Sequence, residues 1–195
     1  MPRKVDHRER RELLADALMR LAAARGLEGV SLRHVAAEAG VSTGMVQHYF
    51  RTKDEMMTFA FDMVMDRVRE RSQAELAPAS PRELVRSLLL QVLPLDETRR
   101  LENHVALAFL AYAAVKPSIA SGLREVVAEM RTYLADQLRA AGPAGGVDPE
   151  RAAAGLLALV DGLGLQLLSR QYAEEDAVAA LDAQLALLFG KPSGQ

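Results

Sequence analysis

Residues 31–50, SLRHVAAEAGVSTGMVQHYF, decide the fold of this chain. Ser31 is placed to cap a short helix, because its hydroxyl can accept a hydrogen bond from a backbone N–H that the first helical turn leaves unpaired. Gly40 stands where that helix ends, since glycine adopts the left-handed conformation without a Cβ clash. Ser42 is placed to cap a second short helix in the same way. Two short helices joined by a glycine-containing turn predict a helix-turn-helix, whose second helix can enter the major groove of DNA.

The outer side of the second helix carries side chains suited to reading base edges. Gln47 can pair bidentately with adenine, and Thr43 and Met45 can contact the methyl group of thymine. Gly44 allows the backbone to approach DNA closely. His48 can donate to a phosphate or a base, with a solvent-facing histidine as the alternative. The residues interpreted as core on the inner side of the two helices are Leu32, Val41, Val46 and Phe50.

This stretch resembles the DNA-binding motif of the TetR family of transcriptional regulators. The likeness covers about residues 8–67 and is carried by Leu32, Arg33, the run from Ala36 to Gly44, His48, Tyr49, Phe50 and Lys53. The resemblance implies that Arg33 reaches base edges, although a solvated arginine is the alternative. It also implies that Tyr49 and Lys53 hold phosphate. Gln47 is a departure, since the family often has an aromatic residue there, so the family gives no expectation for the base read at this position.

An enzymatic interpretation of the same residues competes with DNA binding. Residues 40–44, GVSTG, fit the G-x-S-x-G pattern of a serine hydrolase, with Ser42 as the nucleophile. That turn requires a preceding strand, whereas residues 35–39 form an alanine-rich segment with little β-propensity. The sequence therefore favours a regulator without catalytic residues over a hydrolase.

Composition excludes several classes of site. The chain of 195 residues has no cysteine, so disulfides, thiolate metal sites and cysteine nucleophiles are excluded. The four histidines are far apart and form no H-x-x-x-H pair, so neither a metal nor another cofactor is expected. The charged start, residues 1–11, lacks the apolar run of a signal peptide, and no fully apolar run is long enough to span a bilayer. We expect a cytoplasmic protein.

Charge is distributed unevenly along the chain. Residues 1–53 hold ten Lys and Arg against six Asp and Glu, a balance of +4, which leaves −6 for residues 54–195 and a net charge of −2. A basic N-terminal part fits a polyanionic partner, with chance asymmetry as the alternative. We expect a DNA-binding domain over residues 1–53 and an effector-binding and dimerisation domain over residues 54–195.

Helical periodicity and turn residues predict an all-α fold with about nine helices, in which an N-terminal helix-turn-helix head precedes a larger helical body. Asp6 and Glu9 form a possible capping box for the first helix, and Ser80 with Pro81 marks another helix start. The expected helices span about residues 6–25, 32–39, 43–50, 53–76, 81–93, 96–115, 117–141, 149–171 and 176–189.

The body contains candidates for a small-molecule pocket, because methionine and aromatic side chains adapt to irregular ligands. Ordinary core packing is the alternative for each of them. The candidates are Phe61, Met65, Phe109, Tyr112 and Met130, with His104 and Gln166 as polar groups that orient a ligand or face water. Glu102 and Asn103 are further polar groups beside apolar runs.

The C-terminal part has more apolar residues than one buried face requires, which predicts a surface for a partner. In the family that the chain resembles, the last two helices form a four-helix dimer interface. The expected interface residues are Leu156, Leu159, Val160, Leu163, Leu181, Leu185 and Leu188. Asp161 lies among them and would need a partner if buried. The expected partners are a palindromic operator on double-stranded DNA, a second copy of the chain and a small-molecule effector of unknown identity.

Overall fold

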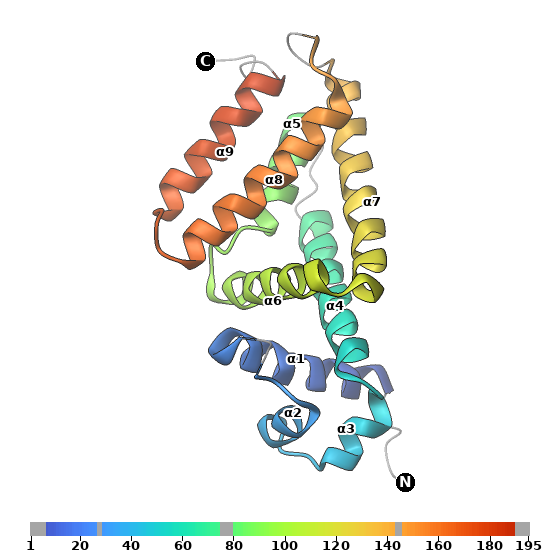
Figure 1. The fold of residues 1–195 in the computed structure, drawn as a ribbon. Coiled ribbons are helices and arrows are strands. Elements are labelled where there is room, and N and C mark those ends of the chain that lie inside the picture. The colour runs from blue at the N-terminus through green and yellow to red at the C-terminus, as the bar shows by residue number, and fades with distance from the viewer. Residues whose placement is uncertain (1–6, 27–28, 75–79, 143–145, 190–195) are drawn as a thin grey trace. The chain divides into compact units, whose positions relative to one another are not determined.

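The computed structural model describes residues 7–26, 29–74, 80–142 and 146–189, which form nine α-helices and no strand (Figure 1). This confirms the all-α prediction. In chain order the helices are α1 (His7–Arg25), α2 (Leu32–Glu38), α3 (Thr43–Tyr49), α4 (Lys53–Ala74), α5 (Pro81–Gln91), α6 (Glu97–Val115), α7 (Pro117–Ala141), α8 (Pro149–Leu168) and α9 (Glu174–Phe189).

The chain divides into two compact units, and each unit is made of two separate stretches of the sequence. The first consists of Met1–Arg67 and His104–Ala120, and the second of Val68–Asn103 and Ser121–Gln195. Helices α4, α6 and α7 therefore each contribute residues to both units. These are structural divisions, and the functional boundary at residue 53 stays a prediction.

In the first unit, α2 and α3 both pack against α1 (Figure 1). Each is seven residues long, too short to be stable alone, so each depends on burying its apolar side. Fully buried side chains at this joint include Leu14 and Leu18 of α1, Val35 of α2, and Val46 and Phe50 at α3.

The turn between α2 and α3 is built as the sequence predicts. The Ser31 hydroxyl accepts from the His34 N–H at 3.3 Å, and the Ser42 hydroxyl accepts from the Met45 N–H at 3.1 Å. Between the caps, Gly40 has φ +67°, a left-handed conformation that favours glycine. The next N–H, of Val41, donates back to the carbonyl of Ala36 at 2.9 Å and closes the end of α2.

The second unit is organised around an apolar core shared by α5, α7, α8 and α9. Its fully buried members include Leu134, Leu138, Leu156 and Leu181. At its edge, the Arg86 guanidinium of α5 donates to both carboxylate oxygens of Asp182 in α9, at 2.6 and 3.0 Å.

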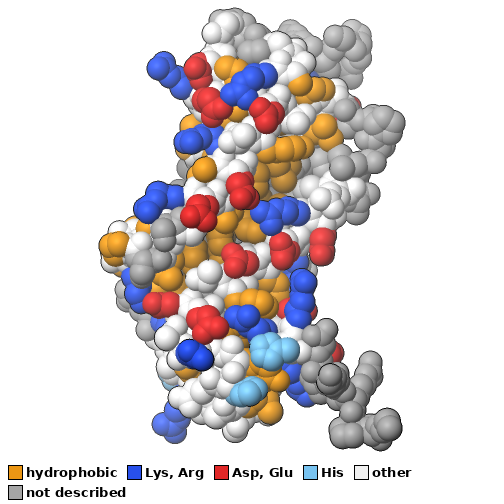
Figure 2. Space-filling model, turned by 90° about the vertical axis from the view of Figure 1, so that its right-hand side faces the viewer, with side chains coloured by type: hydrophobic (Ala, Val, Ile, Leu, Met, Phe, Trp, Pro, Cys, Tyr) orange, Lys and Arg blue, Asp and Glu red, His pale blue; other side chains and the backbone are white. Residues whose placement is uncertain are grey.

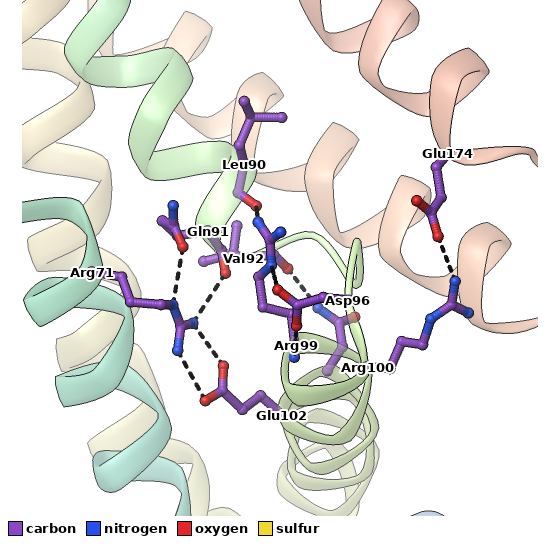
Figure 3. A network of polar contacts seen from close by, with 10 residues as sticks. Arg71, Leu90, Gln91, Val92, Asp96, Arg99, Arg100, Glu102 and Glu174 are labelled. Atoms are coloured by element: carbon purple, nitrogen blue, oxygen red, sulfur yellow. Dashed lines mark hydrogen bonds and ion pairs between the residues drawn. The ribbon is translucent and has the colours of Figure 1, made fainter. Parts of the chain in front are cut away.

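Side chains from α4 and α6 satisfy the last carbonyls of α5 (Figure 3). Arg99 donates to the Leu90 carbonyl at 2.9 Å, Arg71 to that of Gln91 at 3.4 Å, and Asn103 to that of Val92 at 2.5 Å. A helix end leaves its final carbonyls without intrahelical partners, so these contacts fix where α5 stops and α6 begins.

Arg71 also joins α4 to α6 in the second unit. Its guanidinium donates to both oxygens of Glu102, at 3.1 and 2.7 Å, and to the side-chain oxygen of Gln91 at 3.0 Å (Figure 3). Glu102 is only 3% exposed, so Arg71 gives its carboxylate a cationic hydrogen-bond partner inside the unit. Glu102 and Asn103, candidates for facing a ligand or water, are thus engaged by protein groups.

Several helix ends differ from the expected ranges. Helix α8 ends at Leu168 rather than about residue 171, because Arg170 adopts φ +57° and the N–H groups of Gln171 and Tyr172 turn back to the Gln166 carbonyl. A left-handed arginine gives no glycine signal in the sequence, which is why the prediction overran. Helix α5 ends two residues earlier than expected, at Gln91. Asp6 and the end of the fourth predicted helix lie outside the described residues.

Two glycines of α8 give a matched stability test. A Cβ at Gly164 would lie 2.7 Å from Oδ1 of Asn103, whereas a Cβ at Gly155 would meet nothing within 4 Å. We expect Gly155→Ala to raise the free energy of unfolding by roughly 0.5–1 kcal/mol through helix propensity. Gly164→Ala should lower it by about 1 kcal/mol, because moving Asn103 leaves the Val92 carbonyl unsatisfied. Urea unfolding at fixed protein concentration measures both free energies. An equal gain in stability from the two substitutions would contradict the close approach of Asn103 to Gly164.

Candidate nucleic-acid interface

Helix α3 presents the predicted reading residues on one surface. Gly44, Met45, Gln47 and His48 are exposed, while Thr43 is half-buried at the first position of the helix. On the opposite side of the same helix, Val46 is fully buried. Arg33 of α2 is exposed as well. The helix therefore presents the predicted reading residues outward and is held by its apolar side.

Tyr49 is held by two histidines. Its ring centroid lies 4.8 Å from that of His7 in α1 and 5.1 Å from that of His48. Figure 2 shows histidine side chains near one another on the face that it draws. The sequence analysis did not single out His7, because its proximity to Tyr49 arises from the packing of α1 against α3. His7 adds a second imidazole ring, beside that of His48, to this surface.

Arg11 connects α1 to the residues that follow α3. Its guanidinium carbon lies 4.6 Å from the ring centroid of Phe50 and 4.4 Å from that of Phe59, and the side chain donates to Glu55 at 3.3 Å. Glu55 also accepts from the Arg51 N–H at 2.9 Å. A planar guanidinium stacks well on aromatic faces, so Arg11 fixes the connection between α3 and α4. No pattern in the sequence predicted this contact.

The start of α4 is held by a second polar cluster. Asp54, next to Lys53, accepts from the Tyr112 hydroxyl at 2.8 Å and from the Lys116 ammonium. The hydrogen bond from Lys116 holds the pKa of Asp54 below its usual range, and the same bond raises the pKa of Lys116. Lys53 itself lies with its ammonium 6.0 Å from the Tyr112 ring centroid.

The hydrolase interpretation of Ser42 is not supported. A nucleophilic serine needs an exposed, strained turn after a strand and a neighbouring general base. Here Ser42 follows a helix and has extended backbone, and its hydroxyl accepts the capping bond from Met45. Ser42 is a helix cap.

The effector candidates lie in both units. Phe61 and Phe109 stack with centroids 4.4 Å apart and planes 10° apart, and both are buried in the first unit. Tyr112 is engaged by Asp54 in that unit. Besides the half-buried Tyr112, the candidates that keep accessible atoms are Met65 and His104 in the first unit and Met130 and Gln166 in the second.

The expected dimer residues lie mostly on the inner side of α8 and α9. Leu156, Val160, Leu163, Leu181, Leu185 and Leu188 are all buried in the core of the second unit, and Leu159 is half-buried against it. In the single chain, the shared core with α5 and α7 covers the side of α8 and α9 on which the six buried residues lie, so their contact with a second copy stays a prediction. The outward sides carry other residues, namely Ala154, Ala158, Asp161, Gly162 and Leu165 on α8, and Ala179, Ala183 and Leu187 on α9.

Asp161 is the one carboxylate in that outward set of α8 and α9. It is exposed in the single chain, yet desolvation by neighbouring residues raises its pKa above the usual range. Helix α8, Pro149–Leu168, is long and apolar enough to cross a membrane by length and composition. Its buried side packs in the core of the second unit, which accounts for part of its apolar character.

The exposed α3, supported by its capped turn and by α1, defines a helix-turn-helix protein of the DNA-binding class. Comparison with known proteins agrees. Residues 14–58 match the family model for bacterial regulatory proteins of the tetR family, and residues 81–190 match that for the C-terminal part of BetI-type transcriptional repressors. The chain belongs to the TetR family and is a DNA-binding transcriptional regulator.

Individual relatives cover nearly the whole chain. The HTH-type transcriptional regulator PksA of Bacillus subtilis is 36% identical over 177 residues, 86% of this chain and 83% of that protein. The crystal structure of a transcriptional regulator from Rhodococcus sp. Rha1 is 40% identical, with a TM-score of 0.84 over 93% of this chain and 99% of that one. A regulator from Saccharomonospora viridis, solved in complex with choline, is 26% identical, with a TM-score of 0.80 over 90% and 95% of the two chains.

Proposed function

We propose that this regulator is a cytoplasmic homodimeric repressor that binds a palindromic operator and releases it when a small molecule binds the body. The observation that supports operator reading most directly is the outward row of Gly44, Met45, Gln47 and His48 on α3. A recognition helix reads sequence with a few side chains on its exposed side, and α3 has this arrangement.

The proposed DNA contacts divide into readers and phosphate contacts. Arg33 and Gln47 are the readers, because a guanidinium suits guanine and a carboxamide suits adenine, and Thr43, Met45 and His48 lie beside them. Tyr49 and Lys53 hold phosphates and set the register of the protein on the duplex. We propose His7 as a further phosphate-contacting residue, because its ring lies against that of Tyr49.

We propose that the dimer forms through the outward sides of α8 and α9. Leu165 is 54% exposed and Leu187 is 71% exposed, and the residues between them on these sides are small. Small residues let helices approach closely, and the two leucines supply apolar area that a lone chain leaves in water. Asp161 would become more buried in such a dimer, so we expect it to be protonated or to accept a hydrogen bond there.

Choline in the regulator from Saccharomonospora viridis supports a small organic effector for the present chain. Met65 and His104 are proposed as contacts for an effector bound in the first unit, and Met130 and Gln166 for one bound in the second, since all four keep accessible atoms. The buried pair Phe61 and Phe109 and the engaged Tyr112 would contact it only after rearrangement.

The DNA assignments predict two different kinds of loss. Against a duplex selected from a random library, Gln47→Ala and Arg33→Ala should relax the preference at one base pair each, by roughly 1–3 kcal/mol. Lys53→Ala should weaken all sequences alike and reduce the slope of log affinity against log salt by about 0.9 per lost phosphate contact. Repeating the selection and a salt titration with each variant separates the two effects. Unchanged preferences in both reader variants would remove Arg33 and Gln47 from the interface.

The interface assignment predicts opposite outcomes for two neighbouring leucines. Leu165→Glu should give folded monomers, because it places a charge on the exposed side, whereas Leu163→Glu should unfold the second unit, since Leu163 is 3% exposed. Sedimentation with circular dichroism distinguishes monomer from unfolded chain. Val127→Glu, at an exposed valine of α7, is the control and should stay dimeric. A dimer that survives Leu165→Glu would place the interface elsewhere.

Release by an effector predicts reciprocal linkage. Operator DNA should weaken effector binding by the same factor by which the effector weakens DNA binding, about 5–150-fold for a coupling of 1–3 kcal/mol. Calorimetric titration of choline and other small organic cations into the free protein and into the operator complex measures that factor. Equal affinities in the two titrations, or no binding by any of these compounds, would contradict release by this class of effector.

A further inference from the structure

The start of α4 contacts the end of α6 through three polar side chains that all bond to one another. Within the first unit, Asp54 accepts from the Tyr112 hydroxyl at 2.8 Å and from the Lys116 ammonium, and Lys116 also donates to the Tyr112 hydroxyl at 2.7 Å. Each donor has its acceptor, so the three side chains form a closed triangle. The Asp54 and Lys116 side chains are 30% and 35% exposed, which shields the pair partly from solvent.

The triangle holds the chain just after the recognition helix α3, because Asp54 lies in the first turn of α4. Asp54 is the second residue of α4. The first turn of that helix is hydrogen-bonded to the segment that joins it to α3, because Thr52 accepts from the Glu55 N–H at 3.1 Å. Glu55 in turn accepts from the Arg51 N–H at 2.9 Å. A displacement of Asp54 therefore moves Lys53 and the residues after α3 together.

Lys53 lies beside the triangle. Its ammonium is 6.0 Å from the Tyr112 ring centroid, and that of Lys116 is 5.0 Å from it, so the two cations share one aromatic ring. The carboxylate of Asp54 would oppose a DNA phosphate held by the neighbouring Lys53. Lys116 neutralises that charge while it holds the helix.

We propose that Tyr112 and Lys116 are positioning residues for operator binding, which hold the first turn of α4 through Asp54 so that Lys53 meets the DNA phosphate. The proposal rests on the proposed function, in that Lys53 is taken as a phosphate contact. It adds two residues that do not touch DNA and lie more than fifty positions from the helix-turn-helix in sequence. An effector that displaces the end of α6 would then act on DNA binding at this contact.

A double-mutant cycle tests the proposal in the full-length dimer with the selected operator duplex. Lys53→Met and Lys116→Met should each weaken binding about tenfold or more, as expected for loss of a charge-assisted contact in each half-site. Each should also lower the salt slope by roughly 0.9 per half-site. The double variant should bind no more weakly than Lys53→Met alone, because Lys116 acts through Lys53. Fully additive losses, or an unchanged slope in Lys116→Met, would overturn the proposal.

Matched variants separate positioning from charge and from folding. Arg100→Met removes one positive charge from the same helix, where Arg100 pairs with Glu174 at 2.5 Å, and should leave operator affinity unchanged. Lys116→Arg keeps the charge and the donor and should recover most of the affinity. Tyr112→Phe should weaken binding in the same direction with an unchanged urea midpoint. If the Asp54→Asn, Lys116→Met double variant recovers the full operator affinity of the parent, Lys116 only neutralises the charge of Asp54, and the positioning role is overturned.

The outcome for Lys53→Met separates this proposal from the proposed function. If that variant changes neither affinity nor salt slope, the phosphate contact itself is wrong. If it weakens binding while Lys116→Met and Tyr112→Phe do not, the phosphate contact stands and the positioning role is wrong.

Discussion

The packing of α2 and α3 onto α1 is the interaction on which the DNA-binding surface depends. Two seven-residue helices cannot bury enough apolar area between themselves to stay folded. Val35, Val46 and Phe50 therefore fill the space left by α1. Because the inner side of α3 packs in this core, its outer side is left exposed and need not contribute to the packing.

Polar contacts at helix ends fix the positions of α4, α5 and α6. The carbonyls at the end of α5 are satisfied by Arg71, Arg99 and Asn103, and the start of α4 is held by Tyr112 and Lys116. These contacts connect α4 and α6 to their neighbours at defined points along their length. Apolar packing alone tolerates sliding, whereas directed hydrogen bonds fix the position of one helix along another.

The sequence predicted features that depend on neighbouring residues and missed those that depend on folding. Ser31, Gly40, Ser42 and Pro81 act locally, so the helix-turn-helix and most helix bounds could be predicted. The contacts of His7 with Tyr49 and of Lys116 with Asp54 join distant segments and leave no pattern. The dimer prediction named buried leucines because hydrophobicity identifies apolar residues without telling which side of a helix its own chain already covers.

The bidentate pair of Arg71 and Glu102 has a consequence for how α4 can respond to a ligand. Its two hydrogen bonds, at 3.1 and 2.7 Å, tolerate little stretching, and the nearly buried carboxylate of Glu102 has a large desolvation cost once they break. Movement of α4 along α6 within the second unit therefore has to break both hydrogen bonds of this pair. An effector that acts as proposed, by moving α4, would have to supply the free energy lost with this pair, which favours a switch between two states over a gradual tilt of each molecule.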